Sequence, residues 1–242
     1  MTKLYSKWAR VYHDLYQSIF NYRTDFLRFK SILERYSCKN VLEVGCGSGN
    51  LAPYFFSAGY QYTGLDIARA MLAIARNKTP DARFVQGDMR GFSVREKVDA
   101  VLVAGRSFSY MTTNQDVLAA LGSIHKALKP GGILIFDNFE AARIFTNFQN
   151  RIRDDIQVEG RRFIRQSDQS PDLRTGWTWK WDASYVVNQG RRKQKFHDRS
   201  VLRAFTPDEV RLFLALAGFE TLRISRQGVT ILTVARKFKS KR

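Results

Sequence analysis

Residues 41–49 read Val-Leu-Glu-Val-Gly-Cys-Gly-Ser-Gly, and this stretch decides the fold. Its first four residues are typical of a buried strand, and glycines at positions 45, 47 and 49 follow directly. Glycines let a backbone turn sharply and approach a ligand closely. A dinucleotide-binding fingerprint would space them G-x-G-x-x-G, whereas here the third glycine comes early and Glu43 precedes the first. A strand-to-helix turn without a ligand would look similar, so the neighbouring strands must decide.

Short apolar runs alternate with helical patterns from residue 40 onward. Strands are predicted at Val41–Val44, Tyr62–Leu65, Arg83–Gln86, Ala100–Val103 and Ile133–Phe136, with helices at Leu51–Ala58 and Ala70–Arg76. Such alternation predicts an α/β fold whose parallel sheet is covered by helices on both faces. Pro53 suits the first turn of its helix, and Gly59 ends that helix.

The flanking segments have a different character. Tyr5–Tyr36 is mostly helical and rich in aromatic residues, and residues 1–39 are predicted to form one N-terminal helical unit ahead of a core at 40–140. Extended segments at Ile156–Ile164, Trp177–Tyr185 and Lys195–Phe205 predict an antiparallel β insertion over 141–205. Residues 206–242 then supply a helix opened by Thr206–Glu209 and a hairpin of Glu220–Ser225 with Thr230–Ala235, which completes the core sheet.

Composition bounds the setting in which the chain works. The 242 residues carry 40 Lys and Arg against 22 Asp and Glu, a net charge of +18 that lies mostly outside residues 41–150. This basic balance indicates either an ordinary solvated surface or a face for anionic partners. Two cysteines, Cys38 and Cys46, predict reduced thiols and neither a disulfide framework nor a metal site. We expect a cytoplasmic protein with no membrane span and no signal peptide.

Two acidic residues follow the strands next to the glycine turn. Asp66 ends the second strand, and Asp88 follows the third within Gly87-Asp88-Met89. Ligands of open α/β sheets bind outside the carboxyl edge, where both acids are expected. Asp66 there suits ribose hydroxyls and Asp88 an adenine amino group, although each acid alone also suits a helix N-cap.

The ordered series E-V-G-C-G-S-G, L-D-I, G-D-M and L-K-P-G-G resembles the motifs of class I S-adenosylmethionine-dependent methyltransferases over about residues 40–140. The chain is most similar to the branch of small-molecule N-methyltransferases acting on amino sugars and glycine. The resemblance implies a Rossmann-like fold and S-adenosylmethionine as cofactor. It assigns the methionine moiety and its amine to Glu43, Gly45, Cys46, Gly47 and Gly49, the ribose to Asp66, and the adenosine pocket to Ile67, Met71, Gly87, Asp88, Met89 and Ala104.

The acceptor side is less sharply marked. Related small-molecule enzymes use tyrosines of the N-terminal segment as a lid, which implies that Tyr12 contacts cofactor and that Tyr22 acts in catalysis, unless these rings simply pack. His197 in the insertion is a candidate general base, or else part of a solvated strand edge. Trp177, Trp179 and Trp181 are expected on one strand face, either lining the acceptor pocket or forming the core of the insertion.

The sequence therefore predicts an enzyme that transfers a methyl group to a small-molecule acceptor, with amine nitrogen as the first choice. Residues 106–110 lack the Asn/Asp-Pro-Pro-Tyr/Phe tetrad of enzymes that methylate exocyclic base amines. An RNA methyltransferase holding nucleic acid on the basic insertion and tail stays as the alternative. A third possibility is a regulatory protein that binds the cofactor without catalysing methyl transfer.

Overall fold

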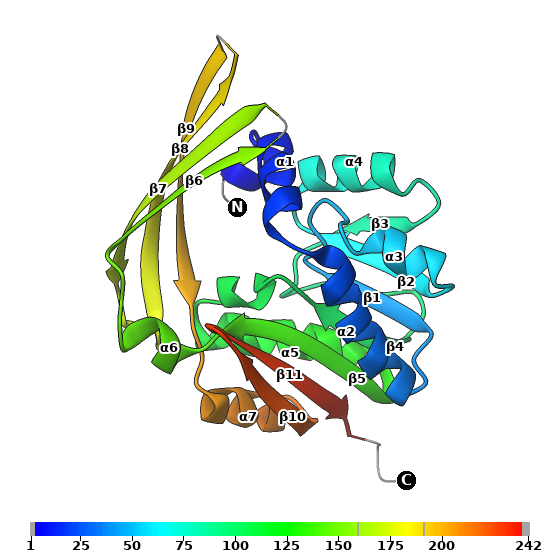
Figure 1. Cartoon of the computed structure of the whole chain (residues 1–242). Coiled ribbons are helices and arrows are strands. Elements are labelled where there is room, and N and C mark those ends of the chain that lie inside the picture. Colours follow the sequence, from blue (N-terminus) through cyan, green and yellow to red (C-terminus); the bar gives the residue numbers. More distant parts are fainter. Residues whose placement is uncertain (1–2, 159, 191, 239–242) are drawn as a thin grey trace.

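The computed structural model describes residues 3–158, 160–190 and 192–238, which form two sheets of different kinds (Figure 1). The central sheet has the strand order β10-β11-β5-β4-β1-β2-β3. Its strands are β1 (Asn40–Val44), β2 (Gln61–Asp66), β3 (Arg83–Gln86), β4 (Val98–Val103), β5 (Leu128–Phe139), β10 (Phe219–Gln227) and β11 (Thr230–Lys237). Strands β1 to β5 are parallel, and β11 runs antiparallel between β5 and β10. The predicted α/β fold class is confirmed.

Helices cover both faces of this sheet because side chains alternate along each strand between two apolar cores. In β1, Val41 belongs to one core and Leu42 to the other. The Val41 core is covered by α2 (Tyr22–Arg35), α3 (Ala52–Ser57) and α4 (Arg69–Lys78), and the Leu42 core by α5 (Asn114–Ala127) and α7 (Pro207–Leu216). Among the described residues, no helix has the length and apolar character needed to cross a membrane.

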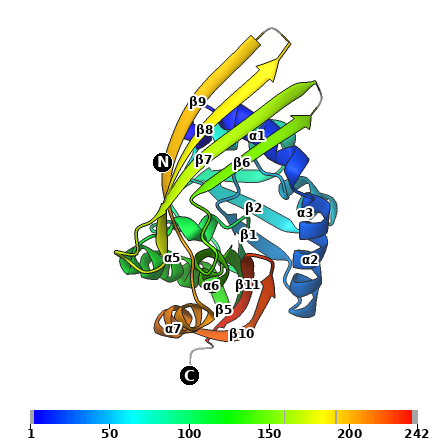
Figure 2. The ribbon, with the colours of Figure 1, turned by 60° about the vertical axis from the view of Figure 1, so that its left-hand side comes forward.

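The second sheet, which we call the cap, is antiparallel and stands beside the core (Figure 2). It consists of β6 (Arg151–Val158), β7 (Arg161–Pro171), β8 (Thr178–Gln189) and β9 (Arg192–Arg203), preceded by α6 (Ala141–Phe145). The single segment predicted at Ile156–Ile164 is wrong, because the chain turns within it at Gly160 (φ 74°). Val158 then pairs with Arg161, and the segment forms two strands in place of one.

The cap joins the core through two chain crossings that bond to each other. The amide of Ala141 donates to the Phe205 carbonyl at 3.0 Å, and the amide of Phe205 donates to the Phe139 carbonyl at 2.9 Å. Nearby, the buried guanidinium of Arg203 donates to Asn114 of α5 at 2.8 Å and Glu209 of α7 at 3.2 Å. Backbone and side-chain bonds together therefore fix where the cap stands on the core.

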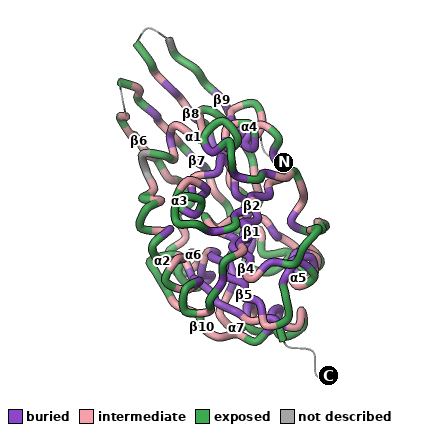
Figure 3. The backbone as a smooth tube through the Cα atoms, turned by 90° about the vertical axis from the view of Figure 1, so that its right-hand side faces the viewer, coloured by how far each residue is buried: buried purple, intermediate pink, exposed green. Residues whose placement is uncertain are grey.

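Helix α1 (Ala9–Ile19) lies between the cap and the core. Leu15 packs with Phe163 and Tyr185 of the cap, whereas Ala9 packs with Met71 of α4. Figure 3 shows buried residues concentrated in the central strands, while the cap strands mix buried and exposed positions. The predicted helical unit at 1–39 thus has two structural parts, since α1 bridges the sheets and α2 packs on the core.

Two glycines that share a backbone conformation provide a matched test of packing. Gly49 and Gly59 have φ values of 67° and 77°. A Cβ at Gly49 would lie 2.8 Å from Cβ of Ala75 in α4, but one at Gly59 would meet nothing within 4 Å. We expect Gly49→Ala to lower the free energy of unfolding by about 3 kcal/mol and Gly59→Ala by about 1–2 kcal/mol, measured by urea denaturation. If both substitutions lowered the free energy of unfolding equally, the close approach of the loop to α4 would make no contribution to stability.

Candidate active site

The glycine turn after β1 is held by backbone hydrogen bonds to β2. The amides of Gly45 and Cys46 both donate to the Leu65 carbonyl, at 2.7 and 3.0 Å. Gly47 has a φ of 55°, and a Cβ built there would meet no atom within 4 Å. A Cβ at Gly45 would instead lie 2.8 Å from Ser107, which follows β4. The turn is therefore fixed at its base and open above Gly47, as a loop that receives a ligand must be.

Asp66 connects this turn to the next helix. Its carboxylate accepts from the Gly47 amide at 2.8 Å and from the Ala68 amide at 2.8 Å, where α4 begins. Burial raises the pKa of Asp66, and these backbone bonds act against that rise. Asp66 therefore joins the turn to the start of α4, although the N-cap residue of that helix is Ala68 and not Asp66. A carboxylate has about four acceptor positions, so Asp66 retains capacity for a ligand hydroxyl beside these backbone bonds.

Glu43 is a buried acid beneath the same turn. It is 4% exposed and accepts from the Tyr62 hydroxyl at 2.5 Å. Burial raises its pKa to about 8, against the Tyr62 hydrogen bond, and the charges of Asp66 and Asp137 raise it further. Within the described residues Glu43 forms no ion pair, so an ionised Glu43 would gain from a cationic ligand.

The predicted adenosine residues gather after β2 and β3. The Ile67 side chain is 44% exposed, and Met89 packs beneath the turn near Gly45. Asp88 is bound by Arg90 at 2.6 Å, and this bond lowers the pKa of Asp88. Met71 is buried against α1, and the Gly87 amide donates to the Asp66 carbonyl.

On the other side of the turn, the Ala104 carbonyl accepts from Ser107 Oγ at 2.9 Å. The structure therefore brings together Glu43, the glycines, Asp66, Ile67, Met89 and Ala104 at one sheet edge, with Asp88 engaged by Arg90.

Helix α1 contacts the turn through residues that the sequence interpretation did not select. His13 Nδ1 lies 2.9 Å from Ser48 Oγ, and Gln17 hydrogen-bonds to Asn50. Both pairs join α1 to the segment that begins α3. The sequence does contain a sign of this contact, because His13 and Gln17 are four residues apart and therefore lie on one face of the helix.

Four tyrosines from three segments form what we call the tyrosine cluster, consisting of Tyr5, Tyr12, Tyr16 and Tyr110. The Tyr5 and Tyr110 hydroxyls lie 2.7 Å apart, and the Tyr12 and Tyr16 rings stack at 4.1 Å. Burial raises the pKa of Tyr5, Tyr12 and Tyr110, so these phenols are neutral at physiological pH. Predicted Tyr12 thus joins Tyr110, which lies in the 3-10 turn η2 (Ser107–Tyr110) after β4 and which the sequence interpretation missed.

Tyr22 lies outside the tyrosine cluster, at the start of α2. Burial raises its pKa to about 12, and a hydrogen bond with Asn50 acts against that rise. Its ring centroid is 6.1 Å from that of Phe20, at the junction of α1 and α2. Tyr22 therefore stands beside the segment that follows the glycine turn.

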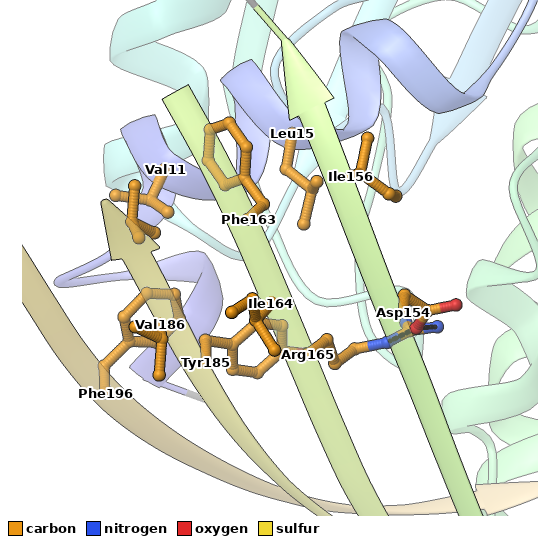
Figure 4. A pocket seen from close by; sticks show the side chains of 11 residues that line it. Val11, Leu15, Asp154, Ile156, Phe163, Ile164, Arg165, Tyr185, Val186 and Phe196 are labelled. Atoms are coloured by element: carbon orange, nitrogen blue, oxygen red, sulfur yellow. Dashed lines mark hydrogen bonds and ion pairs between the residues drawn. The ribbon is translucent and has the colours of Figure 1, made fainter. Parts of the chain in front are cut away.

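The cap contributes an arginine to the space beside α1. Arg165 donates to the Tyr16 hydroxyl at 3.3 Å and forms an ion pair with Asp154 at 2.5 Å. Figure 4 shows the side chains of Arg165 and Asp154 at one end of a pocket. The other walls of this pocket are apolar and include Leu15 and Phe163. A neutralised guanidinium can hold the tyrosine cluster in place without adding net charge.

His197 lies away from this region, contrary to the prediction that it enters the acceptor pocket. In β9, Phe196 and Asp198 are buried against α1 and the N-terminal segment, so the intervening His197 projects from the opposite, exposed face. There it pairs with Asp182, which also binds Arg199 at 2.7 Å. This placement argues against a general-base role and favours the solvated strand edge.

Trp179 and Trp181 share one face of β8, as predicted, whereas Trp177 lies outside the strand. Trp177 precedes β8 and is 38% exposed, whereas Trp179 is buried with Phe139 and Phe145. Trp181 lies half-buried beneath the Arg165 guanidinium, 5.1 Å from its ring centroid. The core interpretation fits Trp179, while Trp181 is partly buried against the apolar clusters on both sides of it.

The chain is similar to known methyltransferases in sequence and in structure. A family model described as a methyltransferase domain matches residues 41–132. A putative methyltransferase, YqeM of Bacillus subtilis, is 29% identical over 76% of this chain and 75% of its own length. The dTDP-3-amino-3,4,6-trideoxy-alpha-D-glucopyranose N,N-dimethyltransferase of Streptomyces venezuelae is 28% identical over 74% of each chain. The solved structure of S-adenosylmethionine-bound CalS10, an amino pentose methyltransferase from Micromonospora echinaspora, has a TM-score of 0.79 and 25% identity over 94% of this chain and 96% of its own.

The electrostatics of Glu43 yield a prediction about stability. The pKa of Glu43 is about 8 in the folded chain, against an ordinary value of 4.5 in the unfolded chain. As pH rises, Glu43 therefore loses its proton first in the unfolded state. Folding stability attributable to Glu43 therefore falls between pH 4.5 and 8. We expect Glu43→Gln to be more stable than the parent, by about 2–4 kcal/mol at pH 8 and by little at pH 5. Urea denaturation of ligand-free protein at both pH values checks this, and a gain independent of pH would contradict it.

The two backbone bonds of Asp66 yield a second prediction. Asp66→Asn removes the charge and leaves one accepting oxygen, so we expect about 10-fold or greater weakening of S-adenosylhomocysteine binding. Asp66→Ala should also lower the melting temperature, because both amide bonds are lost. Calorimetry and thermal melting measure the two effects, with exposed Asp81→Asn as the control for charge. Unchanged affinity in Asp66→Asn would remove Asp66 from the cofactor site.

Proposed function

We propose that this chain, a class I S-adenosylmethionine-dependent methyltransferase, transfers the cofactor methyl group to an amine nitrogen of a small-molecule acceptor. The sequence prediction of this enzyme class and of its cofactor is confirmed by the comparisons. Among amines we favour an amino sugar, because the relative from Streptomyces venezuelae and the solved CalS10 carry amino-sugar activities in their names.

The tyrosine cluster is the observation that carries the proposal for the acceptor. It combines rings from the N-terminal segment and η2, and Ser107 of η2 touches the glycine turn. Phenol hydroxyls with raised pKa donate and accept hydrogen bonds without charge. Such groups orient an amine and leave its lone pair free for in-line attack on the sulfonium.

Methyl transfer needs little further chemistry from the protein. The cofactor supplies the electrophilic methyl group, and the chain must align the acceptor and exclude water. We assign cofactor binding to the glycine turn with Glu43, Asp66 and Met89. Tyr12 and Tyr22 remain our candidates for contacts to cofactor and acceptor, and Tyr110 joins them.

The alternative of RNA methylation rested on the basic insertion. In the cap, however, exposed arginines are largely paired with carboxylates, including Arg162 with Asp155 at 2.7 Å and Arg151 with Asp168 at 2.9 Å. Each such pair engages a guanidinium that would otherwise be available to a phosphate, although the cap stays basic overall. The names of the relatives with amino-sugar activities refer to small molecules and not to RNA. A small metabolite is therefore the acceptor that we favour.

A labelling experiment tests the acceptor class. Purified protein is incubated with methyl-labelled S-adenosylmethionine and either free amino sugars, nucleotide-linked amino sugars or total RNA. We expect label in an N-methylated amino sugar, identified by mass spectrometry, and none in RNA above a heat-inactivated control. Label found in RNA alone would overturn the proposal.

Matched substitutions test the tyrosine that begins α2. We expect Tyr22→Phe to lower kcat about 10-fold while S-adenosylhomocysteine affinity stays within about 2-fold, because its hydroxyl acts during transfer. Tyr54→Phe on exposed α3 and His197→Ala on the outer cap face should leave kcat unchanged. If Tyr22→Phe retains full turnover, then Tyr22 only packs. A loss of turnover in His197→Ala would restore it as a candidate.

A further inference from the structure

Arg106 occupies an unusual position directly after β4. It follows Gly105, adopts a left-handed backbone with φ 62°, and is fixed there by its amide, which donates to buried Asp137 at 2.6 Å. Non-glycine residues rarely adopt this conformation, which costs about 1–2 kcal/mol. The turn therefore places this side chain at the carboxyl edge of the sheet, one residue before Ser107.

Two aromatic rings hold the Arg106 guanidinium. Its central carbon lies 5.0 Å from the ring centroid of Phe139, where β5 ends, and 5.5 Å from that of Phe20, between α1 and α2. The half-buried side chain thus meets the loop after β4, the N-terminal segment and the entrance to the cap. Stacking of this kind fixes the guanidinium plane and leaves its N–H edge available for hydrogen bonds.

The Arg106 guanidinium lacks an anionic partner. Across residues 3–158, 160–190 and 192–238, no carboxylate lies within 4.0 Å of it, and its side chain makes no hydrogen bond to protein. Its charge does favour the ionised forms of Asp25 and Asp137 at longer range. Asp25, however, is paired with Arg28 at 3.1 Å, and Asp137 is bound to the Arg106 backbone amide. Arg165, by contrast, is already neutralised by Asp154.

We propose that Arg106 binds an anionic group of the acceptor, a phosphate or a carboxylate, and so selects amines that carry a negative charge. The inference rests on the proposed function, since it concerns the acceptor side of the same site. A planar guanidinium with free N–H groups matches such oxygens in a bidentate manner. Its charge also disfavours the protonated form of a nearby amine, which keeps the nucleophilic lone pair available.

The first test measures anion binding without catalysis. Sodium pyrophosphate and malonate are titrated calorimetrically into protein saturated with S-adenosylhomocysteine, at about 0.15 M salt to screen the general positive surface. We expect Arg106→Gln to weaken binding of at least one probe 10-fold or more, and Arg106→Lys to weaken it less. Binding of pyrophosphate would indicate a phosphate on the acceptor, and binding of malonate would indicate a carboxylate.

The control is Arg83→Gln, an identical charge change at an exposed position where β3 begins, at the opposite edge of the sheet. Its affinity should match that of the parent. Equal affinities in the parent and Arg106→Gln, or no binding of either probe to the parent, would overturn the proposal. Thermal melting confirms that each variant is folded, and Arg106→Lys retains the charge should Arg106→Gln fail to fold.

A kinetic comparison separates this inference from the proposed function. Glucosamine and glucosamine 6-phosphate are assayed with the parent and Arg106→Gln, and we expect the ratio of their kcat/KM values to fall at least 10-fold in the variant, mainly through KM. Methylation of both sugars with an unchanged ratio would reject the role of Arg106 alone. Anion binding that depends on Arg106, without methylation of any amine, would reject the proposed acceptor and retain the anion site.

Discussion

The carboxylate of Asp66 is the interaction on which the site depends. It joins the glycine turn after β1 to the first residues of α4, and the Leu65 carbonyl beside it receives two amides of the same turn. These bonds require the turn to lie flat against β2, which in turn requires glycine at position 64, because a Cβ there would be 2.8 Å from Cys46 Sγ. The open surface above Gly47 follows from these constraints, since the backbone amides that anchor the turn are directed toward β2 and Asp66.

The cap and the N-terminal segment meet a second physical requirement, the burial of the aromatic surface between them. Helix α1 is too short to be stable by itself, and its aromatic faces need partners on both sides. It gains them from Phe163, Tyr185 and Phe196 of the cap and from Met71 of α4. Helix α1 is consequently part of two cores. Any opening that admits an acceptor must break contacts with one of them, so opening has an energetic cost that cofactor or acceptor contacts can offset.

The sequence predicted the central sheet well because its parallel strands are buried on both faces and read as short apolar runs between turn signals. Two of its errors came from local signals that were not used, and one gap came from contacts that are not local. One extended segment became a hairpin because Gly160 was not recognised as a turn. His197 was placed inward, although alternation with the apolar Phe196 should have directed it outward, since adjacent strand residues face opposite sides. The contacts of Arg106 could not be predicted from local sequence patterns. The rings it contacts, Phe20 and Phe139, come from segments that only the folded chain brings together.

The distribution of charge around the edge of the central sheet suits the reaction that we propose. Glu43 and Asp66 lie on the side that we assign to the cofactor, whereas Tyr5, Tyr12 and Tyr110 place neutral hydroxyls on the side that we assign to the acceptor. Transfer moves one positive charge from sulfur to nitrogen, so carboxylates near the sulfur favour binding of the cationic cofactor and not the transfer itself. A carboxylate beside the acceptor would stabilise the protonated amine before transfer and thereby remove its lone pair. Neutral phenols do not stabilise the protonated amine in this way, so more of the acceptor is present as the free nucleophile than beside a carboxylate.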